Sequence, residues 1–236
     1  MSVQRIVGGS EANRNEYPWL VFLHMKTTLD SFNCGGALIT RDFVLTAAHC
    51  GVFVYLGAHE FPDTNDTSTA VVASLVSVHD AYDDYKKLND IALVKLSSPA
   101  NFTLKVSPAC LGLDGDVQVG DKVVVAGWGK LTNEGDEFPK TLMKVDLEVV
   151  DPMICKESYN GTIEINDNMM CSFASGKDSC VGDSGGPLLV EVGLGQWVAV
   201  GVVSFGAGCA QEYPGIYTRV SKYHNWINEI VQDPQC

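Results

Sequence analysis

The chain of 236 residues is 46% hydrophobic and 19% charged, which is enough apolar material for one large core or two small ones. This balance excludes a disordered chain, and the 23 scattered glycines supply neither a collagen triplet nor a heptad repeat. With 16 basic against 29 acidic side chains, the formal net charge of −13 has the wrong sign for binding nucleic acid or an anionic membrane.

Short apolar, β-branched segments recur along the chain and predict an all-β protein. Clusters of Gly, Pro, Asn and Asp, as in 61–66 and 132–136, separate these segments and supply turns. Over this length, the pattern suits two barrels better than one. The predicted strands are 70–78, 91–96, 122–126, 142–150, 187–192, 197–205 and 216–220.

Helical periodicity is convincing only near the end of the chain, where an amphipathic helix is expected to cover the core. Ser221 is its predicted N-cap. The residues that share the apolar face are Tyr223, Trp226, Ile227, Ile230 and Val231. The longest stretch without charge, 192–211, is interrupted by glycines and predicts strands and turns, so we expect no transmembrane segment.

The cysteine pattern favours disulfides over structural zinc, because the eight cysteines are even in number and show no paired C-x-x-C spacing. Glycosylation acceptors at Asn65, Asn101 and Asn160 agree with an oxidising secretory route. Residues 1–5 are too short and too polar for a signal peptide, so we interpret the chain as a truncated or recombinant form of a secreted, extracellular glycoprotein.

Three motifs carry residue types suited to nucleophilic catalysis. Ser184 lies in the glycine-rich stretch DSCVGDSGGP at 178–187, where backbone N–H groups can approach a ligand closely. His49 precedes a cysteine, and Asp90 stands before an apolar strand. Each alone favours a structural interpretation, as a turn or a core residue. Together they have the order His, Asp, Ser, which differs from the order in subtilisin and in α/β-hydrolases.

On these motifs and on the sequence IVGG at 6–9, the chain resembles the trypsin-like serine proteases of the chymotrypsin family over residues 6–236. The resemblance implies an all-β fold of two six-stranded antiparallel β-barrels, at 6–111 and 112–236, with a C-terminal α-helix and a catalytic cleft between the barrels. It also implies a nucleophile at Ser184, a general base at His49, and Asp90 orienting the imidazole. The backbone N–H groups of Gly182 and Ser184 would form the oxyanion hole.

The resemblance also implies a specificity pocket. Asp178 would lie at its base, and Gly206 and Gly215 would keep its walls open to a long side chain. A buried carboxylate requires a cation, so we expect an endopeptidase that hydrolyses peptide bonds after Arg or Lys. Two alternatives stay open: a catalytically silent binding module on the same fold, and a protease that prefers aromatic or small residues.

Activation is expected by cleavage between Arg5 and Ile6, which makes residues 1–5 a residual pro-segment. The resemblance implies that the freed α-amino group pairs with Asp183 and orders the pocket, so that the uncleaved chain is a zymogen. Expected partners are polypeptide substrates and protein protease inhibitors, and the protease is expected to be a monomer.

The resemblance pairs Cys34 with Cys50, Cys155 with Cys171, and Cys180 with Cys209. For Cys110 we favour Cys236, and the alternative is an intermolecular or lost partner. No cofactor is expected. In the loop 57–68, which corresponds to a calcium loop, Ala58 and Ser68 stand where carboxylates would be expected. Glu60, Asp63 and Asp66 remain as unconvincing ligands, so we predict no tight metal site.

Overall fold

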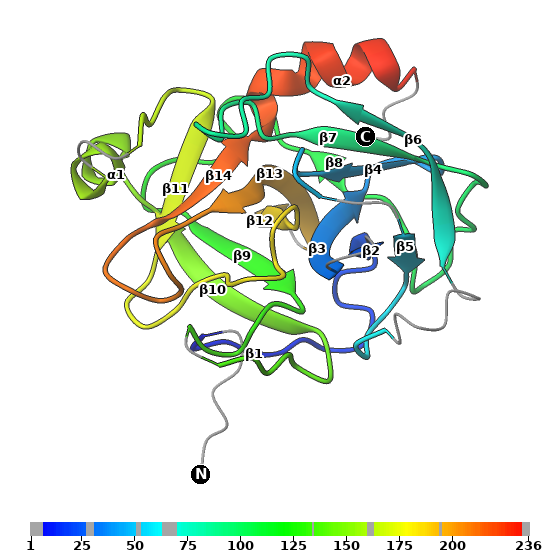
Figure 1. The fold of residues 1–236 in the computed structure, drawn as a ribbon, viewed down its shortest axis with the longest axis horizontal. Helices are drawn as coiled ribbons and strands as arrows, with labels where there is room; N and C mark the ends of the chain where they lie inside the picture. Colours follow the sequence, from blue (N-terminus) through cyan, green and yellow to red (C-terminus); the bar gives the residue numbers. More distant parts are fainter. Residues whose placement is uncertain are drawn as a thin grey trace.

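The computed structural model describes residues 7–26, 31–50, 53–62, 70–133, 135–159, 163–193 and 195–232. Two antiparallel β-barrels of six strands each lie side by side, with the N-terminal barrel in blue to teal and the second in green to orange (Figure 1). The predicted all-β fold of two six-stranded barrels is confirmed.

The first barrel is closed by strands in the order β2-β3-β4-β7-β6-β5. Its interior is filled by aliphatic side chains such as Leu23, Leu38 and Val94, which are fully buried. The strands are β2 (Leu20–Lys26), β3 (Ser31–Leu38), β4 (Phe43–Thr46), β5 (Phe53–Leu56), β6 (Val71–Val78) and β7 (Ala92–Leu96).

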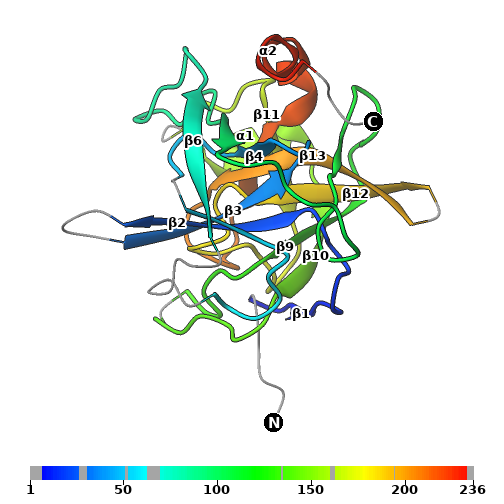
Figure 2. The ribbon, with the colours of Figure 1, turned by 90° about the vertical axis from the view of Figure 1, so that its right-hand side faces the viewer.

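The second barrel closes through the pairings β9–β10, β10–β11, β11–β14, β14–β13, β13–β12 and β12–β9. Two short strands pair with strands of this barrel without being part of its closed ring: β1 (Ser10–Glu11) pairs with β10, and β8 (Cys110–Leu111) pairs with β13. The barrel strands are β9 (Lys122–Gly127), β10 (Met143–Val149), β11 (Met169–Phe173), β12 (Pro187–Gly193), β13 (Gln196–Phe205) and β14 (Gly215–Arg219). The strand pairs β2–β3 and β12–β13 extend to opposite sides of the molecule (Figure 2).

The predicted C-terminal helix is present as α2 (His224–Ile230), which follows a 3-10 turn at Val220–Tyr223. The prediction of Ser221 as N-cap is wrong. Ser221 lies inside the 3-10 turn, and the N-cap is Tyr223, whose side chain makes no capping hydrogen bond. Ile227 and Val231 join the hydrophobic core of the first barrel, so α2 packs on the first barrel although it follows the last strand of the second.

A second helix, α1 (Pro152–Ser158), was not predicted from the sequence. Asp151 caps it by accepting a hydrogen bond from the Met153 amide at 2.7 Å, and Pro152 occupies its first turn. Among the described residues, no helix is long and apolar enough to cross a membrane.

Three predicted disulfides are confirmed: Cys34–Cys50, Cys155–Cys171 and Cys180–Cys209. Cys110 is also disulfide-bonded. Cys236, the partner we favoured for it, lies outside the described residues. That pairing therefore stays a prediction.

Candidate active site

The first barrel supplies a histidine and an aspartate from two neighbouring strand ends. His49 lies in the turn after β4, and Asp90 lies two residues before β7. β4 and β7 pair with Thr46 opposite Ala92, so the ends of these strands are adjacent. The pairing brings together residues that are 41 positions apart in the sequence.

The Asp90 carboxylate is fully buried and faces the imidazole. His49 Nδ1 lies 3.1 Å from Asp90 Oδ1 and 3.0 Å from Oδ2. The Ala48 amide also donates to Oδ1, at 2.8 Å. Because a carboxylate only accepts hydrogen bonds, this contact selects the tautomer with the proton on Nδ1 and leaves Nε2 as an acceptor.

Two residues of the second barrel, which the sequence analysis missed, complete the surroundings of Asp90. Ser204, near the end of β13, donates to Asp90 Oδ2 at 2.5 Å. Thr218 of β14 donates from its hydroxyl to the Asp90 carbonyl oxygen at 2.8 Å. A serine and a threonine in apolar strands carry no signal of this role, because the role depends on the contact between barrels.

The loop that carries Ser184 packs against β3 and against the end of β4, the strand that leads to His49. The Gly35 amide of β3 donates to the Ser184 carbonyl oxygen at 2.7 Å. At Gly185, where φ is +79°, a Cβ atom would lie 2.2 Å from Thr46 Oγ1 and 2.6 Å from the Gly35 carbonyl oxygen. Only glycine permits this approach, which holds Ser184 at the boundary between the barrels.

The backbone N–H groups of Gly182 and Ser184 are free to bind a ligand. Among the described residues, neither group donates a hydrogen bond within the protein. Gly182 has φ of +102°, and a Cβ atom on it would lie 3.1 Å from Phe138 Cε1. Ser184 is half-buried and lines a cavity, whereas Gly182, two residues before it, is buried.

This cavity has a volume of about 270 Å³ and a carboxylate among its lining groups. Asp178 is 6% exposed, and burial raises the pKa of its carboxyl to about 6. A Cβ atom on Gly215 would lie 3.2 Å from Asp178 Oδ1, whereas one on Gly206 would approach only the Gly208 carbonyl oxygen at 3.6 Å. The lining residues are Asn133, Asp178, Ser179, Cys180, Val181, Ser184, Val203, Ser204, Phe205, Gly206, Gly208, Cys209 and Gly215.

A second carboxylate, Asp183, precedes Ser184 in the same loop and is buried. Its oxygens accept hydrogen bonds from the Gly129 amide at 2.7 Å and the Cys180 amide at 2.9 Å. Burial raises the pKa of this carboxyl to about 6. Among the described residues, no cationic side chain forms an ion pair with it.

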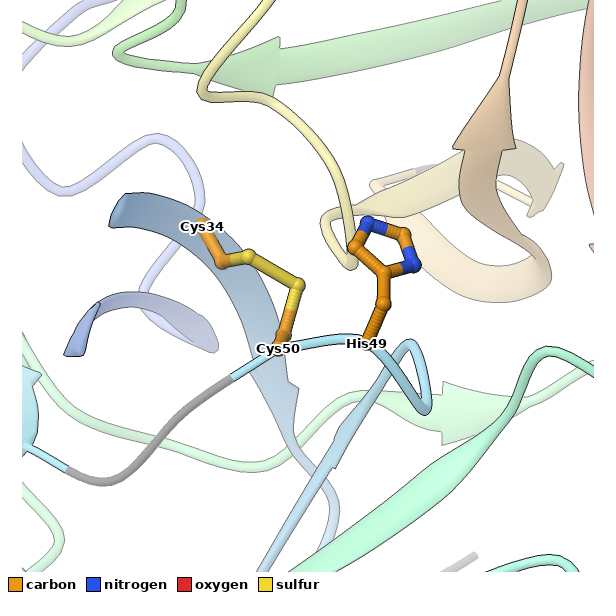
Figure 3. A group of neighbouring side chains, drawn as sticks. All are labelled: Cys34, His49 and Cys50. Atoms are coloured by element: carbon orange, nitrogen blue, oxygen red, sulfur yellow. A yellow bond between two sulfur atoms is a disulfide. The ribbon is translucent and has the colours of Figure 1, made fainter. Parts of the chain in front are cut away.

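His49 lies near a disulfide, but this cluster does not offer a thiolate metal site. The ligand atoms of Cys34, His49 and Cys50 lie within 4.8 Å of one another. Both sulfur atoms are committed to the Cys34–Cys50 disulfide, which lies beside the imidazole (Figure 3). Glu60, one of the three weak calcium candidates, forms an ion pair with Arg14 at 3.1 Å; the other two, Asp63 and Asp66, lie outside the described residues.

Several predicted residues lie outside the described part of the chain. The start of the described chain is nevertheless close to the pocket, because the Asp178 amide donates to the Val7 carbonyl oxygen at 3.2 Å. Asn101 is exposed, as a glycan acceptor must be. The residues without a description are Arg5, Ile6, Asn65, Asn160 and Cys236.

A comparison with protein-family models matches residues 6–227 to the family described as Trypsin. The match begins at the residue after Arg5, spans both barrels and ends within α2.

Proposed function

Because the chain belongs to the trypsin family of serine endopeptidases, we propose that it hydrolyses polypeptides after Arg or Lys through a Ser184–His49–Asp90 triad. The observation that carries this proposal is a single constellation. The half-buried Ser184 lines a cavity that contains the buried Asp178 carboxylate, and Ser204 of the same lining donates to Asp90, which is paired with His49.

In the proposed reaction, Ser184 Oγ attacks the carbonyl carbon of the scissile bond and His49 Nε2 accepts the hydroxyl proton. The Gly182 and Ser184 N–H groups stabilise the oxyanion that develops. His49 then donates the proton to the leaving amine, which leaves an acyl-enzyme that water hydrolyses by the same route. Asp90, supported by Ser204, holds the imidazole tautomer and stabilises its transient positive charge.

The preference for Arg or Lys is supported by the environment of Asp178. Its carboxyl is buried and its pKa is raised, so the ionised form is unfavourable until a cation pairs with it. A guanidinium or ammonium group on a long side chain supplies this partner. A neutral side chain would leave the charge unpaired, which disfavours aromatic and small residues in this pocket.

Activation by cleavage between Arg5 and Ile6 is supported by Asp183. It is a buried carboxylate with two N–H donors, and it lacks a described cationic partner. Val7 already contacts the pocket at Asp178, so the amino group released at Ile6 starts one residue from this contact. Its pairing with Asp183 would fix the loop that also carries Gly182 and Ser184.

The setting that we propose is extracellular. The disulfides support secretion, and the exposed Asn101 supports glycosylation there, with Asn65 and Asn160 as further acceptors. We propose a monomer that needs no cofactor and that protein inhibitors regulate. The division into barrels at 6–111 and 112–236 agrees with the position of β2 to β7 before the boundary and β9 to β14 after it.

The proposal is tested with the chain processed to begin at Ile6 and with reporter peptides that differ only in Arg, Lys or Phe before the cut. We expect Arg and Lys to be cleaved and Phe to be poor. The substitution Asp178→Ser is expected to lower kcat/KM for Arg by about a thousandfold, the equivalent of leaving a buried ion without its partner. Asp146→Ser, which removes an exposed aspartate from β10, is the matched control.

Two outcomes overturn parts of the proposal. Faster cleavage after Phe would contradict the role of Asp178 and favour a protease for aromatic residues. A processed chain whose Ser184 does not react with a phosphonylating inhibitor would favour a binding module without catalysis.

A further inference from the structure

One wall of the specificity pocket consists of residues 206–214, which connect β13 to β14 and belong to no strand. Gly206, Gly208 and Cys209 of this segment line the cavity. Gly208 and Ala210 have positive φ angles of +82° and +54°. Without strand pairing, the position of the wall depends on its bonds to other parts of the chain.

Three backbone N–H groups of this wall donate to side chains that come from separate parts of the sequence. The pairs are Ala207 to Tyr159 (3.2 Å), Cys209 to Asn133 (3.0 Å) and Ala210 to Asp178 (3.0 Å). The last acceptor is the carboxylate at the base of the pocket. The position of the wall and the geometry of this carboxylate are therefore linked.

Asn133 supplies the central contact from a distant element. It lies in the loop between β9 and β10, 76 residues before Cys209, and its side chain also lines the cavity. Cys209 is 8% exposed and Asn133 is exposed, so this part-buried hydrogen bond ties a buried residue of the wall to a loop at the surface. The disulfide to Cys180 fixes the side chain of Cys209, and Asn133 fixes its backbone.

We infer that Asn133 is a positioning residue that sets the affinity of the pocket for a cationic side chain. By accepting from Cys209, it holds the wall where Ala210 can donate to Asp178. It makes no hydrogen bond to His49, Asp90 or Ser184 among the described residues, so its loss affects binding rather than the chemical step. This inference rests on the proposed function of the same pocket.

The test compares processed wild-type protein with Asn133→Ala. We expect KM for an Arg reporter and the inhibition constant of benzamidine, an amidine cation, to rise together by about tenfold, the equivalent of one lost hydrogen bond. The value of kcat per phosphonylated Ser184 should stay unchanged. Asn133→Asp keeps an acceptor oxygen and should retain tight binding. Thr132→Val removes the acceptor of the Gly135 amide in the same loop and is the matched control.

The outcomes separate this inference from the proposed function. If wild-type protein cleaves after Arg but Asn133→Ala binds benzamidine equally well, the inference is wrong and the proposed function stands. A parallel loss of kcat, or an equal loss in Asn133→Asp, indicates a general structural role and also overturns it. If wild-type protein does not cleave after Arg, the proposed function is wrong, and the inference that rests on it is wrong as well. Asn133→Leu gives the same comparison if the Ala variant does not fold.

Discussion

Two carboxyl groups near the active centre have pKa values that burial raises to about 6, those of Asp178 and Asp183. Both values lie above the ordinary value of 3.8, so the folded chain binds more protons than the unfolded chain between about pH 4 and pH 6. The free energy of unfolding that these groups contribute therefore falls as the pH rises through this range. At neutral pH each carboxylate is ionised at a cost that a cationic partner would offset.

For Asp178, this predicts how the binding of a cation depends on pH. Benzamidine pairs with the ionised carboxylate, so its dissociation constant should be constant above about pH 7 and rise about tenfold per pH unit well below pH 6. Competitive inhibition or calorimetry of the processed protein measures this. The control is Asp178→Asn, whose weaker binding should not change over the same range. A flat profile for the wild-type protein would contradict the pairing.

The proposed catalytic and pocket residues could be singled out in the sequence because each lies in a short motif of unusual composition. Asp178, Asp183 and Ser184 share one glycine-rich stretch. Ser204 and Asn133 could not be predicted in this way, because each acts on a residue more than 70 positions away. Only the packing of strands and loops shows which backbone or carboxylate group each contacts.

At the scale of elements, strands were predicted well where apolar residues are continuous. The expected strand 122–126 is β9 (Lys122–Gly127), and the expected 187–192 is β12 (Pro187–Gly193). The helix α1 was missed because it has seven residues and only one of them, Cys155, is buried, so no apolar period develops. The apolar face of the C-terminal helix was predicted correctly, but the residue at which the helix begins was not. Ser221, the expected N-cap, lies in the 3-10 turn that precedes α2.

The packing of α2 on the first barrel predicts its contribution to stability. Ile227 is fully buried in the barrel core. Ile227→Ala should therefore lower the free energy of unfolding by about 3 kcal/mol, measured by urea denaturation of the disulfide-intact chain. Glu229→Ala, which changes an exposed residue of the same helix, should change it by less than about 0.5 kcal/mol. Equal effects of the two substitutions would show that α2 does not contribute to the core.

The two barrels are joined by more than the chain that links them. The first described residues pair with the second barrel through β1, and α2 packs on the first. Phe61, between β5 and β6, packs against Phe138, between β9 and β10, at 5.6 Å between ring centroids. Phe138 in turn lies next to Gly182, where a Cβ atom would approach its ring to 3.1 Å. The proposed oxyanion hole is thus supported from both barrels, and its geometry depends on their relative position.

The activation proposal predicts a change in the stability of the whole molecule. Cleavage after Arg5 converts the amide nitrogen of Ile6 into an ammonium group, which should lower the pKa of Asp183 by favouring its ionised form. The processed chain should then unfold at a higher temperature than the unprocessed chain at neutral pH, and this difference should shrink as the pH falls below about 6. Thermal unfolding of both forms across pH measures the effect. In Asp183→Asn the pH-dependent part should disappear, and an equal pH dependence of both wild-type forms would contradict the pairing.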